Sequence, residues 1–249
     1  MNLFSICTLV TDFSQYETMT KSFRASGFND DIASFQFIDN SASNVMDGYS
    51  GNNELISRSN SKYIILCHQD VEVIYDNADQ LLSRLDELEG LDSSWGVAGN
   101  AGGMKGRKLA VRISDPQGKN TKLGSLPALV NTLDENFLVI KRSANLGFSR
   151  DLSGFHMYGP DLVMQAKLRG WNAYVIDFHL LHKSGGKKDE TFYKCLSQFE
   201  EKYCSLQKPI ELIRSPIESA IIIARSHALL RVFRILKAAR QLLRWKSKS

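Results

Sequence analysis

Short apolar runs alternate with amphipathic segments along the first 100 residues, and this alternation constrains the fold more than any other feature. Runs of strand length occupy residues 3–10, 32–39, 63–67 and 95–99. Segments with the apolar spacing of helices separate them, and the first such segment ends at Gly27, a residue typical of helix ends. Strands that alternate with helices usually form a parallel sheet with helices on both faces. The sequence therefore predicts an α/β fold with a doubly wound sheet.

The second half of the chain continues this pattern after a polar interval. Residues 102–127 are rich in glycine, lysine and serine, so we expect a mobile connection at the sheet's edge. A hairpin strand over residues 108–114 is expected within it. The later predicted elements are strands at 136–143 and 172–178 and helices at 160–170 and 189–205. With 249 residues the chain can build one large domain of this kind.

Cysteine usage and the lack of targeting segments indicate a cytoplasmic protein. The four cysteines form no Cys-x-x-Cys pair, and Cys7 and Cys67 lie inside apolar runs, so we expect buried thiols rather than disulfides. The N-terminal residues lack the basic segment of a signal peptide. Because no run of about 20 apolar residues occurs, we expect no membrane-spanning helix.

Charge is distributed unevenly along the chain. The whole chain carries a net charge of +4, but nine basic residues and one acidic residue lie between Arg214 and the C-terminus. The remainder is therefore mildly acidic. Such a distribution argues against a broad nucleic-acid-binding surface and favours a localised anionic partner.

The basic C-terminal segment has the pattern of an amphipathic helix. From Leu229 its apolar residues recur every three or four positions, basic residues occupy the other side, and Trp245 lies near the end. Such a helix can lie in a membrane interface and be attracted to anionic lipid, by about 1 kcal/mol per basic residue. We therefore divide the chain into a domain, residues 1–208, and a basic amphipathic helical tail, residues 209–249. The alternatives are a helix packed on its own domain and a coiled-coil seam in a homodimer.

The strand at residues 63–67 runs without a turn residue into three polar side chains, His68, Gln69 and Asp70. In sheets of this kind, ligands bind beyond the carboxyl ends of the strands. Thr11 and Asp39 end two other predicted strands, so we expect them at the same rim. The polar residues at these strand ends therefore predict a binding site.

Several kinds of site are excluded because their motifs are missing. The sequence lacks G-x-G-x-x-G, G-x-x-x-x-G-K-[ST], G-x-S-x-G, H-E-x-x-H and paired cysteines. What remains is Asp70, with His68 two positions earlier on the same side of the strand, and several carboxylates and histidines downstream. Asp70 and His182 could hold Mg²⁺ or Mn²⁺ against a diphosphate. Asp161 could then remove a proton from an attacking hydroxyl.

Six segments occur in a fixed order between residues 1 and 186. They read FIDNSAS, KYIILCHQDV, WGVAGNAG, TLDENFLVIKR, GFHMYGPDLVMQAKLRGW and HLLHKSGG. Together they resemble family 2 glycosyltransferases with the GT-A fold, and more closely a bacterial subgroup marked by His-Gln-Asp-Val at the metal-binding turn. The resemblance implies a Rossmann-like mixed sheet flanked by helices, followed by the helical extension.

The resemblance also implies roles for individual residues. Four of them would bind the nucleotide-sugar donor: Thr11, Asp39, His68 and Asp70. Of these, His68 and Asp70 stand where related enzymes carry Asp-x-Asp, so Asp70 would reach the metal. Asp134 would lie near the donor sugar or the acceptor, although it and Glu135 could equally be structural.

Two further roles come from the later segments. Asp161 falls at the position of the catalytic base of inverting members, and His182 at that of a histidine that completes the metal site. His68 departs from the family pattern because it replaces the first aspartate, and Glu72 is either its stand-in or a solvated residue. Structural alternatives remain open: Asp39 could form an Asx turn, Asp161 could complement the helix dipole, and His182 could be a core histidine.

The function implied is inverting transfer of a sugar from a nucleotide-sugar, with a UDP-sugar as the first expectation, to a hydroxyl of a glycan or lipid-linked acceptor. A divalent cation, Mn²⁺ or Mg²⁺, would be held by Asp70 and His182. Synthesis of a bacterial surface polysaccharide, such as capsule, O-antigen or lipopolysaccharide, would place the enzyme on the inner face of the cell membrane as a peripheral protein. The alternative is a non-catalytic nucleotide-sugar-binding or membrane-peripheral scaffold protein of the same fold.

Overall fold

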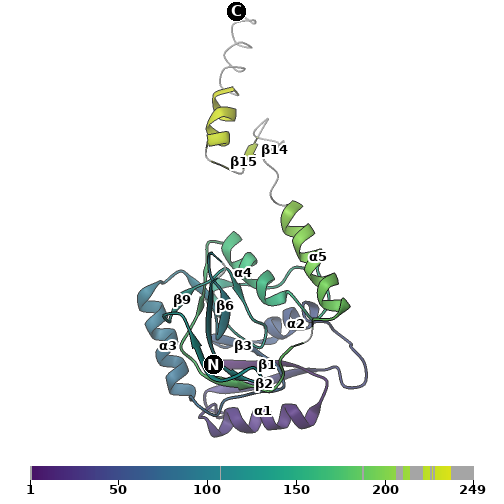
Figure 1. The fold of residues 1–249 in the computed structure, drawn as a ribbon, viewed down its shortest axis with the longest axis vertical. Coiled ribbons are helices and arrows are strands. Elements are labelled where there is room, and N and C mark those ends of the chain that lie inside the picture. Colours follow the sequence, from purple (N-terminus) through teal and green to yellow (C-terminus); the bar gives the residue numbers. More distant parts are fainter. Residues whose placement is uncertain are drawn as a thin grey trace, which may run out of the picture. The chain divides into compact units, whose positions relative to one another are not determined.

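The computed structural model describes residues 2–106, 108–186, 188–205, 210–213, 221–224, 226 and 228–236. The chain divides into two compact units, Met1–Leu196 and Ser197–Ser249. The first unit is built around two β-sheets and contains every residue that the sequence places at the site (Figure 1).

The larger sheet has seven strands in a mixed arrangement. In order across the sheet they are β2 (Ala33–Asp39), β1 (Phe4–Val10), β3 (Tyr63–Cys67), β11 (Phe137–Lys141), β5 (Trp95–Gly99), β12 (Asn172–Val175) and β9 (Ala128–Leu129). β11 runs antiparallel between β3 and β5, so the expectation of an all-parallel sheet is wrong and that of a mixed sheet is confirmed. The chain passes from β5 to β11 through further strands, whereas a parallel strand needs a long crossover, usually a helix.

The smaller sheet places a second group of strands beside the site. Its order is β10 (Thr132–Leu133), β6 (Ala101–Gly103), β7 (Leu109–Asp115), β13 (Leu180–His182) and β4 (Val71–Glu72), and β8 (Gly118–Leu123) also pairs with β7. Residues 102–127 therefore contribute three strands, where we expected a mobile connection with one hairpin strand. The reason is that Ala110 and Ile113 of β7 are buried, so this segment packs as part of the core.

Helices cover both faces of the larger sheet. The helices of the first unit and its boundary are α1 (Phe13–Ala25), α2 (Ser50–Arg58), α3 (Ala78–Leu91), α4 (Tyr158–Leu168), α5 (Glu190–Ser205) and a 3₁₀ turn, η1 (Arg142–Ala144). α1 and α3 bury Phe23 and Leu85 in one core with Phe4 and Trp95 of the sheet. α2 packs on the opposite face, where a Cβ at Gly51 would lie 2.7 Å from a methyl carbon of Leu9.

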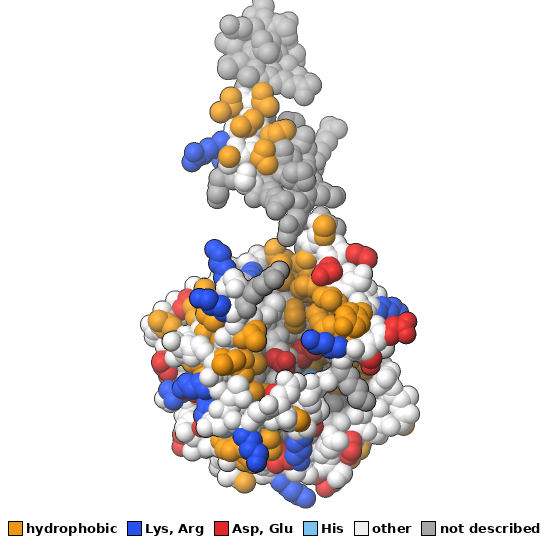
Figure 2. Space-filling view, viewed as in Figure 1, with side chains coloured by type: hydrophobic (Ala, Val, Ile, Leu, Met, Phe, Trp, Pro, Cys, Tyr) orange, Lys and Arg blue, Asp and Glu red, His pale blue; other side chains and the backbone are white. Residues whose placement is uncertain are grey.

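Cysteines and surface charges complete the description of the first unit. All four cysteines are free thiols, as expected. Cys7 and Cys67 are buried in their apolar runs and Cys195 is buried too, but Cys204, which belongs to the second unit, is exposed, so the expectation of buried thiols fails there. On the face shown in Figure 2, basic and acidic side chains are interspersed over the described surface of the first unit. Neither sign of charge forms a continuous area on that face.

The second unit differs in part from the expected helical tail. Beyond α5 it contains β14 (Ile210–Ile213), which pairs antiparallel with β15 (Ile221–Ala224), and a helix over residues 228–236. Strands therefore occupy positions within the segment 209–249. Residues 237–249, including Trp245, lie outside the described residues. Among the helices that the structure describes, none combines the length and the apolar character needed to cross a membrane.

Candidate active site

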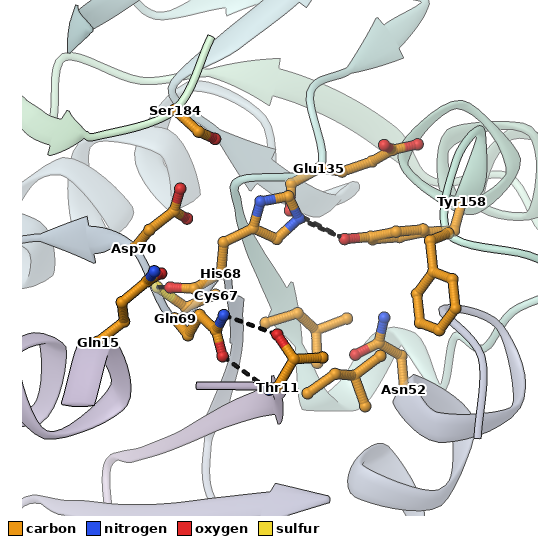
Figure 3. A pocket seen from close by; sticks show the side chains of 13 residues that line it. Thr11, Gln15, Asn52, Cys67, His68, Gln69, Asp70, Glu135, Tyr158 and Ser184 are labelled. Atoms are coloured by element: carbon orange, nitrogen blue, oxygen red, sulfur yellow. Dashed lines mark hydrogen bonds between the residues drawn. The ribbon is translucent and has the colours of Figure 1, made fainter. Parts of the chain in front are cut away.

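A cavity of about 250 Å³ opens beyond the carboxyl ends of β1 and β3 (Figure 3). Its polar lining consists of Thr11, Gln15, Asn52, His68, Gln69, Asp70, Glu135, Tyr158 and Ser184. Ligands of α/β sheets bind at this edge, and the three polar residues that follow β3 line the cavity. This position explains why the buried strand β3 is followed directly by polar residues.

His68 and Asp70 line the cavity and form a compact cluster with His182, which is not among the described lining residues. Their candidate ligand atoms all lie within 4.8 Å of one another, and His182 Nε2 is 3.4 Å from Asp70 Oδ1. The cluster follows from strand pairing: β13 runs antiparallel to β4 with His182 opposite Val71, the residue after Asp70. A backbone hydrogen bond of 3.1 Å from Lys183 N to Asp70 O fixes the same register.

His68 is oriented by a tyrosine on the other side of its ring. Its Nε2 lies 2.6 Å from the hydroxyl of Tyr158, the first residue of α4. The other ring nitrogen, Nδ1, faces the side of the cavity that holds Asp70 and Ser184 (Figure 3). Burial, and after it the neighbouring His182, lowers the pKa of His68, so the imidazole is neutral at pH 7 and can donate a lone pair to a cation.

Asp70 is held in its ionised form. Burial alone would raise the pKa of its carboxyl group, but hydrogen bonds and charge from His182, together with Ser184 and His68, bring that pKa well below the usual range. Glu72, which could have stood in for the missing first aspartate, forms an ion pair with Lys183 instead. Asp70 is therefore the carboxylate of this cluster.

A divalent cation fits the cluster. With bonds of about 2.1 Å in octahedral geometry, neighbouring ligand atoms lie roughly 3 Å apart and opposite ones roughly 4.2 Å apart. The 3.4 Å between His182 Nε2 and Asp70 Oδ1 lies within that range, and no two candidate ligand atoms of the cluster are more than 4.8 Å apart. Imidazole ligands favour a transition-metal ion such as Mn²⁺ over Mg²⁺. The two residues expected to hold the metal, Asp70 and His182, are joined in this cluster by His68, which the sequence assigned only to donor binding.

Gln69 joins the ends of β1 and β3, a role that sequence reasoning missed. Its Oε1 accepts hydrogen bonds from Thr11 N at 2.8 Å and Asp12 N at 3.0 Å, and its Nε2 donates to Thr11 Oγ1 at 2.9 Å. Thr11 is therefore at the cavity, as expected, with its hydroxyl already contacted. The sequence offered one signal for this role. The amide side chain of Gln69 follows β3, next to the end of β1, where backbone N–H groups need an acceptor.

Asp39 lies one strand away from the cavity lining. It ends β2 beside Val10 of β1, is exposed, and accepts hydrogen bonds from Ser41 N at 2.9 Å and Ser41 Oγ at 2.6 Å. These bonds lower the pKa of Asp39. The geometry is that of an Asx turn, the alternative left open by the sequence. Its role in nucleotide binding stays a prediction.

Asp134 and Glu135 differ in position although they are adjacent in the chain. Asp134 is exposed, and its Oδ1 accepts hydrogen bonds from the backbone and side-chain nitrogens of Asn136, at 3.0 and 2.5 Å. Of the two, it is Glu135 that lines the cavity. Contact between Asp134 and a sugar stays a prediction.

Asp161 is fully buried in the first turn of α4. Its two oxygens accept hydrogen bonds from Ser149, 2.8 Å from the backbone nitrogen and 2.6 Å from the hydroxyl. It is absent from the described residues that line the cavity. The structure therefore separates Asp161 from Asp70, and its role as a base stays a prediction that this geometry does not favour.

No family model matches the chain. A curated relative, the "ATP synthase subunits region ORF 6" protein of Fuscovulum blasticum, is 38% identical over 208 residues, which cover 81% of this chain and 83% of the relative. The chain belongs to the family of this ORF 6 protein. The name of the ORF 6 family locates a reading frame and states no activity.

Solved structures identify the fold. The chain is similar to residues 1–349 of S. aureus TarS with UDP (TM-score 0.55, 11% identity, 81% of this chain and 65% of that chain). It is also similar to the mannosyltransferase PcManGT of Pyrobaculum calidifontis with GDP-Man and Mn²⁺ (TM-score 0.54, 9% identity, 82% of this chain and 64% of that chain). A further TarS structure is similar as well (TM-score 0.51, 10% identity, 74% of this chain and 37% of that chain). This chain spans less than two thirds of the length of each of these three solved chains. At such low identity the likeness shows the fold alone, and that fold is the expected GT-A fold of glycosyltransferases. Membership of the His-Gln-Asp-Val subgroup stays a prediction.

Proposed function

We propose that this protein transfers a glycosyl group from a nucleoside-diphosphate sugar to an acceptor hydroxyl. The observation that carries the proposal is the cluster of His68, Asp70 and His182, placed at a cavity beyond the carboxyl ends of the strands in a GT-A fold. Two neighbours in fold were solved with UDP and with GDP-Man and Mn²⁺, which supports a donor of this chemical class.

The cluster is suited to the donor's diphosphate. Asp70 and the two histidines would hold a divalent cation, which when bound would neutralise the charge that develops on the departing diphosphate. Thr11 and Asp39, at the ends of two adjacent strands, would contact the nucleotide. Asp134 would then lie toward the sugar or the acceptor.

The finer parts of the proposal concern stereochemistry, acceptor and location. We propose inversion at the anomeric carbon, a UDP-sugar donor, and a glycan or lipid-linked acceptor in the synthesis of a bacterial surface polysaccharide. Phe155 lines the cavity and is 39% exposed, so an aromatic face is available at its mouth for the apolar side of a sugar ring. Attachment to an anionic membrane surface would come from the basic C-terminal segment.

A non-catalytic nucleotide-sugar-binding protein of the same fold is the second candidate. Two observations favour it: His68 replaces the first aspartate of the family pattern, and the expected base, Asp161, is sealed away from the cavity. Turnover of a bound nucleotide-sugar separates the two candidates.

The test is ligand-dependent thermal stability of the full chain. UDP, GDP and their sugar conjugates are expected to raise the melting temperature only when Mn²⁺ is present. A ligand at 100 times its Kd adds about 2.7 kcal/mol to the free energy of unfolding. Asp70→Asn is expected to abolish the shift, because it removes the charged ligand of the cluster, whereas Asp86→Asn on the exposed side of α3 retains it.

The outcomes separate the candidates. A shift followed by release of free sugar or transfer to an acceptor supports the enzyme. A shift without either reaction supports the binding protein. If millimolar nucleotide-sugars with Mn²⁺ leave the melting temperature unchanged, the proposal fails.

A further inference from the structure

Two carboxylates, Asp70 and Glu135, line the cavity among the described residues, and they lie on different sides of His68 (Figure 3). Asp70 belongs to the cluster with His68 and His182, and Glu135 lies next to the hydrogen-bonded pair of His68 and Tyr158, with its carboxylate directed away from Asp70. A transfer reaction of the proposed kind needs charge stabilisation at the leaving diphosphate and proton removal at the acceptor. The cavity therefore has a carboxylate available for each task.

The side chain of Glu135 is held by the start of α4. Gly159 N lies 3.4 Å from Glu135 Oε1, and the backbone N–H groups of Met157 and Tyr158 also act on the carboxylate. Met157 itself has a φ of +66°, a left-handed conformation that a methionine adopts only when its surroundings enforce it. These backbone N–H groups hold the carboxylate in place, and the carboxylate can still accept a proton.

Gly159 makes this arrangement possible. A Cβ at that position would lie 2.4 Å from Leu133 O and 3.1 Å from Glu135 Cγ. Any larger residue would therefore push the segment that carries Glu135 away from α4. The position of the Glu135 side chain therefore depends on glycine at position 159.

The other acidic groups near the cavity are already committed. Asp161 is buried against Ser149, Asp134 is exposed and bound to Asn136, and Asp70 contacts His182. His68 is engaged by Tyr158 on one nitrogen and faces the cluster with the other. Among the described residues that line the cavity, Glu135 is thus the carboxylate outside the cluster that can accept a proton.

We propose that Glu135 is the general base of the reaction, an inference that rests on the proposed function. Its carboxylate accepts the proton of the acceptor hydroxyl as the hydroxyl oxygen forms a bond to the anomeric carbon. The bond between that carbon and the diphosphate oxygen breaks, and its electron pair leaves with the nucleoside diphosphate. The proton ends on Glu135, and no further reactant is required.

The electrostatic surroundings of Glu135 suit this role. Burial, and after it the neighbouring Asp134 carboxylate, raises the pKa of Glu135 to about 8. Tyr158 is the other titratable group packed beside it, and the three backbone N–H groups partly oppose the rise. A base whose pKa lies near the working pH combines a useful proton affinity with a sufficient ionised fraction. Because the base must be ionised, kcat/KM is expected to rise with pH up to about 8 and then level off.

The test compares Glu135→Gln with wild type, using Mn²⁺, a nucleotide-sugar donor and its acceptor. Glutamine keeps the shape and can still accept hydrogen bonds from α4, so the melting temperature, the donor KM and the affinity for Mn²⁺ with nucleoside diphosphate are expected to be unchanged. The value of kcat is expected to fall between about 100-fold and about 10,000-fold, as on loss of a general base. Glu17→Gln on the surface of α1 is the matched control and is expected to retain wild-type turnover.

Two further readouts exclude a merely structural role. Glu135→Gln should lose the rise of kcat/KM with pH, and Glu135→Ala should recover part of its turnover when formate is supplied as an external proton acceptor. Turnover of Glu135→Gln within threefold of wild type overturns the inference but leaves the proposed function standing. Equal loss of diphosphate binding and turnover also overturns it, because that result assigns Glu135 to binding. Absence of both nucleotide binding and turnover in wild type overturns the function and the inference together.

Discussion

The hydroxyl of Tyr158 decides which nitrogen of His68 faces Asp70 and His182, its partners in the cluster. It contacts His68 Nε2 at 2.6 Å and can donate to the backbone oxygen of Glu135 at 3.5 Å. With Nε2–H donating to the phenol oxygen, the lone pair of the neutral ring is on Nδ1, which faces the side of Asp70. Ligand histidines in metalloproteins are commonly oriented through their second nitrogen in this way.

Tyr158→Phe is therefore expected to weaken Mn²⁺ binding about tenfold, because the ring of His68 loses its fixed tautomer and orientation. The fold should persist, since the phenyl ring keeps its edge contacts with Tyr49 and Phe148. Titration of the protein with Mn²⁺, followed by the electron paramagnetic resonance of the free ion, checks this. Tyr49→Phe is the control, because the Tyr49 hydroxyl donates to His156 O. Equal affinities of Tyr158→Phe and wild type would contradict the expectation.

At the level of single residues, sequence reasoning located the strand-end positions better than the helical ones. Polar residues after β3 had to emerge at the rim because the strand before them is buried, so His68 and Asp70 could be placed without coordinates. The first turn of a helix gives no such direction. Asp161 points to Ser149, twelve positions earlier in the chain, and this contact depends on a loop conformation that no local pattern predicts.

Between elements, Asp47 connects the start of α2 with the loop before α4. Its Oδ1 accepts hydrogen bonds from Tyr49 N, Ser50 N and Ser50 Oγ, at 3.1, 2.8 and 2.6 Å. Its Oδ2 accepts from Gly154 N at 2.8 Å. Burial of the carboxyl would raise its pKa, but these hydrogen bonds outweigh burial and lower it. Asp47 thus holds together two segments that are distant in the sequence.

Asp47→Asn is expected to lower the free energy of unfolding by about 1–2 kcal/mol at pH 7. This value is at the low end for hydrogen bonds to a charged group, because Asp47 is partly exposed and solvent screens its charge. Because the folded-state pKa lies below the unfolded value of about 3.9, this stability is complete above about pH 5 and is lost as the pH falls through the folded-state pKa. Urea unfolding between pH 7 and pH 3 measures it, with the exposed Asp31→Asn as control. A difference from wild type that stays constant down to pH 3 would contradict this account.

The elements themselves were mostly predictable, and their connections were not. The apolar runs match β1, β3 and β5 because each is a buried strand, and β2, which is only partly buried, still has enough apolar side chains to be recognised. The direction of β11 was missed, since direction depends on the route of the chain between strands. β6 and β8 were missed because glycine, lysine and asparagine carry little apolar signal, and pairing with β7 forms them.

At the scale of the whole molecule, charge and position of the C-terminal segment are the features open to a direct test. The helix over residues 228–236 carries Arg231 and Arg234 and exposes Val232, Ile235 and Leu236. Exposed apolar side chains next to basic ones are what an anionic membrane interface accommodates. The proposed location of the enzyme depends on this segment.

The double substitution Arg231→Gln with Arg234→Gln is expected to weaken binding to phosphatidylglycerol vesicles by roughly 30-fold, from about 1 kcal/mol for each charge removed. Co-sedimentation with vesicles of phosphatidylglycerol, and with vesicles of phosphatidylcholine as reference, gives the partition coefficients. Lys21→Gln with Lys108→Gln removes the same charge from the exposed surface of the first unit and should bind as wild type does. Equal loss in both double variants would show that the C-terminal helix has no special part in binding.

The pairing of β13 with β4 has a consequence during synthesis of the protein. Asp70 and His68 leave the ribosome early, but His182 follows only after most of the first unit has been synthesised. A partly made chain therefore lacks one of the three candidate cation ligands until β13 pairs with β4. On the proposed function, immature copies would bind neither the cation nor the nucleotide-sugar, and competence to bind would report that assembly is complete.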